Sequence, residues 1–428
     1  VLMRGLALGC LLPLLPLHAA APTPQTLWDA WPQVRVSPSD PWSLKHLGLR
    51  LALTRLQARH PELFSIEMEG RSSEGRAIPL LKVGHGPRGV LLWSQMHGDE
   101  PTATSALLDL LAWLGAHPSD PMAQRIQSEL TLWIIPMLNP DGAERTQRRN
   151  AQEIDVNRDA LRLASPEGRF LKSVRDRYQP MLGFNLHNQN PLLRVGASGE
   201  QVAFSLLAVP GDEACTETPG VRLAKQVGVQ VQRTVSPWAP GRVARYDMDY
   251  TERAFGDSMT RWGTPTLLIE TGGWAGPGEA ERLVRLHTVA LLGALGAVAD
   301  GRVGALDPRD YDRIPLNHRD ALASLVLRGA QVLSGRGLPP FTADLSFVVP
   351  TAFAGDAPRR REPSLQDVGD LTHVRGLDEL NASGLLAVPW PDPRATADWL
   401  ALRAALVAEG LEEVPEARLR EAVASHGD

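Results

Sequence analysis

The sequence predicts an α/β fold, in which helices cover both faces of a largely parallel β-sheet. Three observations lead to this prediction. Strand-like and helix-like runs alternate between residues 44 and 300. Several strand-like runs are almost entirely apolar, as expected for strands buried on both faces. The composition, with 428 residues of which 43% are hydrophobic and 22% charged, is that of a globular chain with room for two or three domains.

Hydrophobic periodicity places the individual elements. Leucines recur at helical spacing before Pro61, which predicts an amphipathic helix over residues 44–60. Apolar runs of strand length predict β-strands at residues 78–83, 89–95, 130–137, 181–186, 203–209 and 266–269. Longer periodic runs predict helices at residues 102–114, 223–234 and 279–299.

The sequence pattern changes after Asp300. Short β-like runs at residues 324–332, 345–349 and 385–388 are separated by stretches rich in Pro, Gly and Arg, and a helical tail is expected over residues 396–424. We therefore expect a catalytic domain over residues 44–300 and a smaller β-rich accessory domain, of unknown role, over residues 301–428. Residues 22–43 are rich in Pro and Trp and are expected to form an extended lead-in.

The first 21 residues have the pattern of a secretory signal peptide. Arg4 precedes an apolar run over residues 6–17, and small residues follow at Ala19–Ala21. That run is shorter than the ~20 residues a membrane-spanning helix needs. We therefore expect a secreted, periplasmic protein without stable membrane insertion. Cys215 is the one cysteine expected to remain, so no internal disulfide is predicted. The formal net charge is -5, so the protein as a whole lacks the positive electrostatic potential that would attract nucleic acid.

A possible metal site begins at the end of a predicted strand, where His97 is followed three residues later by Glu100. Strand ends are where α/β sheets place ligand-binding groups. His187 ends another predicted strand and supplies a third potential ligand. Two histidines and one glutamate with an open fourth position are typical of a catalytic zinc site.

Other residues that could take part in catalysis or substrate binding occur between and after these three in the sequence. Residues 139–142 (Asn-Pro-Asp-Gly) are expected to form a turn at the end of a strand. Arg148 and Arg158 could polarise a carbonyl group, or bind a carboxylate through two parallel hydrogen bonds from one guanidinium group. Glu270 ends a predicted buried strand, where a carboxylate is costly unless it is used or paired.

In its order along the chain, this series resembles the carboxypeptidase A-like zinc metallocarboxypeptidases, also called funnelins. Their pattern is His-x-x-Glu, Asn-Pro-Asp-Gly, an Arg, a segment like Asp-x-Asn-Arg, a lone His and a strand-end Glu. The matching positions are His97, Glu100, residues 139–142, Arg148, Asp155, Asn157, Arg158, His187 and Glu270. Residues 70–78 also resemble the opening hairpin of the family, and the resemblance covers about residues 44–300.

The resemblance implies a mixed, mostly parallel eight-stranded sheet flanked by helices, and one Zn²⁺ per chain. It makes His97, Glu100 and His187 the zinc ligands and Glu270 the general base. General base catalysis by a carboxylate beside a zinc-activated water agrees with the chemistry of these groups.

The resemblance also implies roles for the remaining positions. Arg148 would stabilise the oxyanion that develops during the reaction. Asp155 would orient a zinc-bound histidine and fix its tautomer. Asn157 and Arg158 would bind the terminal carboxylate of the substrate.

The sequence also departs from the family pattern. The tyrosine that closes over the substrate could be Tyr246 or Tyr250, and we choose Tyr250. Asp99 stands where the vertebrate digestive members carry an Arg, and Asn185 stands where many relatives carry an Asp. The specificity wall is expected in residues 253–262, without a predicted side-chain preference.

We therefore expect a zinc metallocarboxypeptidase that hydrolyses the C-terminal amide bond of peptides carrying a free terminal carboxylate. One alternative is a periplasmic amidase that acts on muropeptides at γ-D-glutamyl-diaminopimelate bonds. Another is deacylation of N-acyl amino acids, as in the aspartoacylase-like branch, which lacks a clear Asn-Pro-Asp-Gly segment. A fourth hypothesis, from a different class, is a catalytically dead binding module on the same fold.

Overall fold

The computed structural model describes residues 23–247, 249–319, 322–333, 339–349, 363–387 and 412–413. The expected signal peptide, residues 1–21, lies outside the described residues, as does most of the expected helical tail. The two described residues of that tail, Glu412–Glu413, form a short strand, β16, so the expected helix is wrong at these positions.

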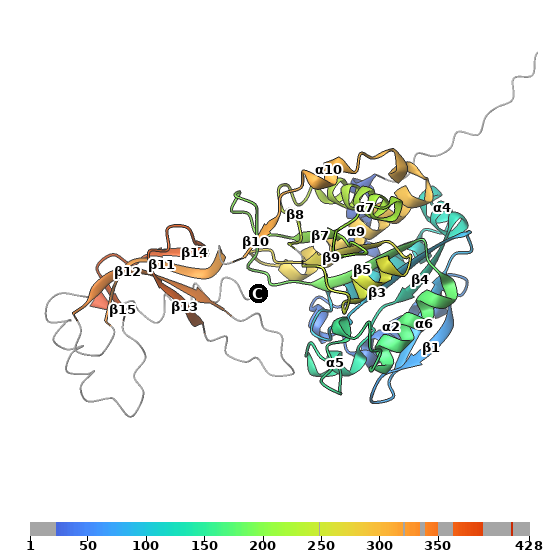
Figure 1. Ribbon diagram of the computed structural model, residues 1–428, viewed down its shortest axis with the longest axis horizontal. Coiled ribbons are helices and arrows are strands. Elements are labelled where there is room, and N and C mark those ends of the chain that lie inside the picture. The colour runs from blue at the N-terminus through green and yellow to red at the C-terminus, as the bar shows by residue number, and fades with distance from the viewer. Residues whose placement is uncertain are drawn as a thin grey trace, which may run out of the picture.

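A mixed eight-stranded sheet forms the centre of the larger domain (Figure 1). In sequence order its strands are β1 (Phe64–Arg71), β2 (Ala77–Val83), β3 (Arg88–Ser94), β4 (Leu130–Ile135), β5 (Leu182–Asn188), β7 (Phe204–Ala208), β8 (Val243–Arg245) and β9 (Thr266–Thr271). Their spatial order is β1-β2-β4-β3-β5-β9-β7-β8. The central strands β4, β3, β5 and β9 are parallel, whereas β1, β2 and β7 form antiparallel pairs. The predicted fold class is confirmed.

Helices cover both faces of this sheet because successive side chains of each strand point to opposite sides. In β3, Val90 and Leu92 join one hydrophobic cluster, while Leu91 and Trp93 join the other. The first cluster includes residues of α2 (His46–Arg59), α3 (Thr102–Ala116), α4 (Pro121–Glu129), α7 (Pro219–Val235) and α9 (Glu279–Ala299). The second includes residues of α6 (Pro166–Tyr178) and α8 (Phe255–Arg261).

Helix α9 is long and apolar enough to cross a membrane by length and composition alone, and it is the one such helix among the described residues. In this structure 83% of its apolar stretch is buried inside the protein. It therefore serves as a core helix of the larger domain.

The lead-in was expected to be extended, but much of it is helical. Residues Pro24–Val34 form α1, and Pro41–Ser43 form the short 3-10 helix η1. Thr23 caps α1 by accepting a hydrogen bond from Thr26 N, and Pro24 suits the first helical position. Leu27 and Trp31 are buried, so burial of one face stabilises the helix.

The larger domain also extends past residue 300, where we had expected it to end. Residues Arg302–Ala305 form η3, Arg309–Asp312 form α10, and the short strand β10 (Asn317–His318) pairs with β6 (Arg194–Val195). The buried Tyr311 donates a hydrogen bond from its hydroxyl to Leu206 O at 2.9 Å and accepts one from Ala208 N at 2.9 Å. These contacts fix residues 302–318 to the edge of the large sheet.

A second sheet forms the smaller C-terminal domain, separate from the large one in Figure 1. Its strands are β11 (Leu322–Val332), β12 (Phe341–Val348), β13 (Ser364–Gly369), β14 (Arg375–Asn381), β15 (Leu385–Ala387) and β16. A small hydrophobic cluster that includes Leu325, Leu327 and Leu345 lies on it. This agrees with the expected β-rich region after residue 300.

One buried carboxylate attaches the N-terminal segment to the larger domain. Asp109, fully buried on α3, accepts hydrogen bonds from Trp31 Nε1, Val36 N, Ser37 N and Ser37 Oγ at 2.8–2.9 Å. Four donors converge on two oxygens, which satisfies a carboxylate that water cannot reach.

Replacing this carboxylate tests the attachment. We expect Asp109→Ala to lower the free energy of unfolding by about 2–5 kcal/mol, because four buried donors lose their acceptor. Urea denaturation of the purified protein measures the change. The control is Asp176→Ala on α6, where an exposed carboxylate pairs with Lys172 and Arg175, and where a loss within about 1 kcal/mol is expected. Equal losses in the two variants would contradict the prediction.

Candidate active site

The candidate site lies where the central parallel strands reach their carboxyl ends. His97 and Glu100 follow β3, and the segment around Asn139 follows β4. His187 is the last residue but one of β5, and Glu270 is the last residue but one of β9. Parallel strands present these ends at one edge of the sheet, so residues distant in the sequence meet there.

The loop after β3 is held in a tight conformation. Gln95 has a positive φ of 51°, and its side chain donates to Gly98 O at 2.9 Å and accepts from Thr104 Oγ1 at 2.8 Å. A Cβ on Gly98 would lie 2.0 Å from the carbonyl carbon of Gly142, so this position requires glycine. The loop thereby turns the side chains of His97 and Glu100 toward each other.

Within the described residues, His97, Glu100 and His187 form a buried triad whose potential ligand atoms all lie within 4.8 Å of one another. One oxygen of Glu100 lies 2.8 Å from His97 Nδ1, and the other lies 2.6 Å from His187 Nδ1. Two imidazoles and a carboxylate suit a zinc ion and leave a fourth coordination position for water or substrate. The donor set therefore fits the metal that the sequence predicted.

The carboxylate of Glu100 and the two imidazoles of the triad stabilise each other's charged forms. Burial opposes ionisation of Glu100, but the imidazoles of His97 and His187 hold its pKa well below the usual range. Burial also opposes protonation of His97, but the carboxylates of Glu100 and Asp155 raise the pKa of His97 to about 9. The pKa of His187 is lowered, chiefly by burial.

Asp155 and Arg148 extend this arrangement toward the surface. Asp155 Oδ1 accepts a hydrogen bond from His97 Nε2 at 3.1 Å, which leaves Nδ1 of that ring directed at the triad. Arg148 donates to Asp155 Oδ2 at 3.0 Å and lies 3.1 Å from His97 Nδ1. Burial raises the pKa of Asp155, but His97 and Arg148 outweigh it and lower that pKa. Arg148 therefore lies over the triad with a half-exposed guanidinium.

Glu270 lies beside the triad on the neighbouring strand. It pairs in register with His187 across β9 and β5, so the two side chains leave the same face of the sheet. Its Oε2 is buried and has no hydrogen-bond partner among the described residues. Burial, with repulsion from the Glu100 carboxylate, raises the pKa of Glu270 to about 8. A buried carboxylate that is not paired is a functional candidate.

Asn157 and Arg158 lie in the short 3-10 helix η2 (Val156–Arg158). Asn157 Oδ1 accepts from Phe255 N at 2.9 Å and thus connects η2 to the start of α8. Arg158 is exposed and donates to Asn157 O at 2.8 Å. Asn157 N donates to Asp155 Oδ1 at 2.9 Å, so η2 adjoins the carboxylate that contacts His97.

The structure brings Tyr246, rather than Tyr250, close to the site. Burial and the carboxylate of Glu270 raise the pKa of Tyr246. Tyr246 directly follows β8, and its backbone N donates to Leu206 O at 2.9 Å. Tyr250 is half-buried four residues further on. The choice of Tyr250 stays a prediction, while the electrostatic interaction with Glu270 favours Tyr246.

The Asn-Pro-Asp-Gly segment, expected to be a turn, begins the short helix α5 (Pro140–Arg145). Asn139 caps this helix through Gly142 N at 2.9 Å, and its amide donates to Met96 O at 3.3 Å and Arg148 O at 3.4 Å. Asp141 accepts from Ser72 Oγ at 2.7 Å in the hairpin between β1 and β2. The motif thus holds the loops that carry His97 and Arg148.

Sequence reasoning missed two supports of the metal-binding loop. One is Gln95, whose side chain is described above. The other is Trp42 in η1, whose Nε1 donates to Asp99 O at 3.1 Å. Neither residue belongs to a recognisable motif, and the polar Gln95 directly after an apolar strand was the one available signal.

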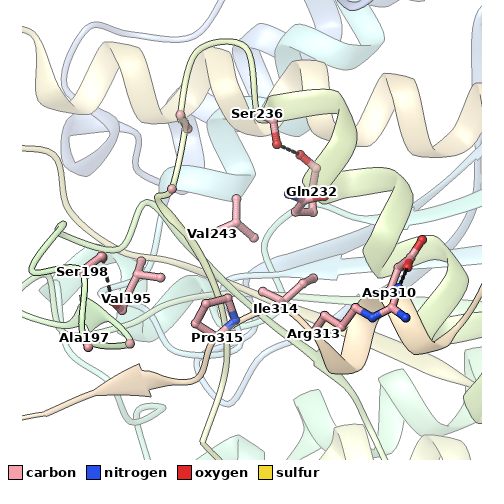
Figure 2. Close-up of a pocket in the computed structure, with 13 residues that line it drawn as sticks. Val195, Ala197, Ser198, Gln232, Ser236, Val243, Asp310, Arg313, Ile314 and Pro315 are labelled. Atoms are coloured by element: carbon pink, nitrogen blue, oxygen red, sulfur yellow. Dashed lines mark hydrogen bonds and ion pairs between the residues drawn. The ribbon is translucent and has the colours of Figure 1, made fainter.

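A separate cavity of about 350 Å³ lies between the end of α7, the loop after β6 and the segment from α10 to β10 (Figure 2). Its lining includes Val195, Gln232, Ser236 and the ion pair of Arg313 with Asp310 at 2.6 Å. None of the candidate site residues lines it. It is therefore distinct from the metal triad.

Residues 50–180 match the family model described as zinc carboxypeptidase. This segment is therefore similar to zinc carboxypeptidases. The matched segment holds His97, Glu100, Arg148, Asp155, Asn157 and Arg158, while His187 and Glu270 follow it.

The curated relatives match this chain over short stretches. Carboxypeptidase SOL1 of Arabidopsis thaliana is 38% identical over 99 residues, which is 23% of this chain and 18% of that protein. Probable carboxypeptidase 2 of Trichophyton verrucosum is 29% identical over 190 residues, which is 41% of this chain and 36% of that protein. The chain therefore spans well under half the length of these relatives.

Among solved structures, a metallo-carboxypeptidase from Pseudomonas aeruginosa in complex with (2-guanidinoethylmercapto)succinic acid is 23% identical, with a TM-score of 0.46. The match covers 59% of this chain and 69% of that one.

The triad predicts the metal content of the purified protein. We expect about one zinc per chain, because three protein ligands and one open position form a complete site. His187→Ala should lose most of the zinc, whereas Glu270→Gln should keep it, since Glu270 lies beside the triad without belonging to it. Elemental analysis of protein dialysed against buffer measures the content.

The matched control is His85→Ala, which removes an exposed imidazole before β3, at the opposite end of that strand from His97. It should retain the zinc of the unaltered protein. Full zinc occupancy in a folded His187→Ala protein would show that this residue is not a ligand.

Proposed function

We propose that this protein is a zinc-dependent metallocarboxypeptidase that hydrolyses the C-terminal amide bond of peptides. One observation carries the proposal: the buried, unpaired carboxylate of Glu270 lies beside a His–Glu–His triad at the open edge of the sheet. The match of residues 50–180 to the zinc carboxypeptidase family model supports it.

Glu270 would act as the general base. A zinc ion held by the triad supplies a Lewis acid for the scissile carbonyl and makes a nearby water more acidic. Glu270 takes a proton from the attacking water and later gives it to the leaving nitrogen. Burial raises the pKa of Glu270 to about 8, and the positive charge of a bound zinc ion would favour the ionised carboxylate that accepts the proton.

Two arginines would act on the substrate. The guanidinium of Arg148 lies over the triad, where it can donate to the oxygen that gains charge as the carbonyl is attacked. Arg158 can donate two parallel hydrogen bonds to the terminal carboxylate of a peptide. Asn157, whose Oδ1 is committed to Phe255 N, supports the position of Arg158 and keeps its amide hydrogens for the substrate.

A periplasmic amidase that acts on muropeptides would use the same residues and remains the second candidate. Its substrates would likewise present a free carboxylate next to the scissile bond. The hypothesis of a catalytically dead binding module is disfavoured because all three potential ligands and Glu270 are present and close together. The pattern of residues 1–21 supports the further proposal that the protein is secreted to the periplasm.

The role of Glu270 can be tested directly. We expect Glu270→Gln to lower kcat by about a hundred- to ten-thousandfold, because a carboxamide cannot accept the proton. Steady-state hydrolysis of a blocked dipeptide measures the change, with zinc content checked in parallel. Glu129→Gln, which neutralises a partly exposed carboxylate paired with Arg88, is the control and should keep its activity. An unchanged kcat in a zinc-loaded Glu270→Gln protein would rule out the role.

A second test distinguishes a carboxypeptidase from an enzyme that cleaves internal bonds. Peptides amidated at the C-terminus should be cleaved with a kcat/KM lower by about ten- to a hundredfold, because Arg158 loses a charged partner. Arg158→Ala should lower the rate for the free acid and remove most of the difference. Arg309→Ala, an exposed arginine on α10, should preserve the difference. If acid and amide are cleaved equally fast, Arg158 does not bind the carboxylate.

A further inference from the structure

An arginine-lined cavity opens beside the candidate site. It has a volume of about 880 Å³, and its lining includes Arg149, Arg158, Arg162 and Arg253. The cavity also reaches Asp155, the residue that bonds His97. It is therefore continuous with the group that orients the metal triad.

The acidic residues that line this cavity are already committed to other partners. Asp155 accepts from His97 and from Arg148. Asp159 accepts from Ala164 N at 2.9 Å, and from Ser165 N and Ser165 Oγ at 2.7 Å each. Neither carboxylate forms an ion pair with any of the four arginines that line the cavity.

Two of the guanidinium groups are without a carboxylate. The side chains of Arg162 and Arg253 form no hydrogen bond or ion pair with the part of the chain that the structure describes. Glu252, the neighbour of Arg253, pairs with Arg261 at 3.1 Å. Arg149 donates only to the backbone oxygen of Glu153, at 2.9 Å.

The arginines come from separate loops that are fixed to one another. Ala160 N donates to Arg253 O at 3.1 Å, which joins the loop after η2 to the loop before α8. Asn157 Oδ1 binds Phe255 N two residues further on. Like charges repel when they are brought together, so an anion bound among these guanidinium groups would be stabilised.

We propose that this cavity is a subsite for a second carboxylate of the substrate, so that the enzyme prefers peptides whose C-terminal residue has an acidic side chain. The inference rests on the proposed function, because Arg158 is taken to bind the terminal carboxylate. Arg162 and Arg253, with Arg149, then bind the side-chain carboxylate. Their planar guanidinium groups suit a carboxylate, which accepts two parallel hydrogen bonds.

The experiment compares two peptides of equal size and shape that end in Glu or Gln and differ only in this carboxylate. The unaltered zinc-loaded protein should favour the Glu peptide by about tenfold or more in kcat/KM, because a charged hydrogen bond is lost with Gln. The double variant Arg162→Gln/Arg253→Gln should reduce this preference to less than about twofold, as expected when the charged partners are removed. The matched double control, Arg302→Gln/Arg309→Gln, removes two exposed charges that do not line the cavity and should keep the preference.

A binding measurement separates this inference from the proposed function. Titration calorimetry should show that N-acetylglutamate binds the full-length protein at least about tenfold more tightly than N-acetylglutamine, and that the double variant loses this difference. If no peptide is cleaved but this difference is found, the subsite stands and the proposed function fails. If peptides are cleaved with equal preference for Glu and Gln, or if the two acids bind equally, the inference is overturned.

Discussion

The burial of Glu100 between two imidazoles is the constraint on which the rest of the site depends. A carboxylate removed from water is stable only when positive charge or hydrogen-bond donors surround it. His97 and His187 each face one of its oxygens. Asp155 in turn accepts hydrogen bonds from His97 and Arg148, so negative and positive groups alternate from Glu100 out to the solvent. Each member compensates its neighbour, so the group behaves as one coupled unit and not as a set of independent side chains.

The β-sheet and the loops at its strand ends fix the positions of these side chains. Parallel strands bring His187 and Glu270 into register, and hydrogen bonds to Asn139 and Gln95 fix the loops at their ends. The close approach of Gly98 to Gly142 leaves no room for a side chain at either loop. Side chains carried on such rigid supports keep their geometry without having to be ordered by the substrate.

Much of this arrangement could be predicted from the sequence, because apolar runs define the strands and polar residues stand out where those runs end. The bounds of α9 and the residues of the triad followed from such local patterns. Other features depended on contacts between distant segments. Residues 140–145 form a helix because Asn139 caps them, and α1 forms because Leu27 and Trp31 find a buried surface. The position of Tyr246 and the grouping of Arg162 with Arg253 depend on how loops pack, which periodicity does not encode.

The attachment of the N-terminal segment has a consequence for proteolysis of the protein. Thr23 caps α1, the indole of Trp31 donates to Asp109, and Trp42 supports the backbone at Asp99 beside the metal ligands. A protease that cut after Thr23 would remove the helix cap, and one that cut after Trp42 would also remove a support of the metal-binding loop. Damage to this exposed end of the chain would therefore reach the candidate metal site through the residues between Thr23 and Trp42.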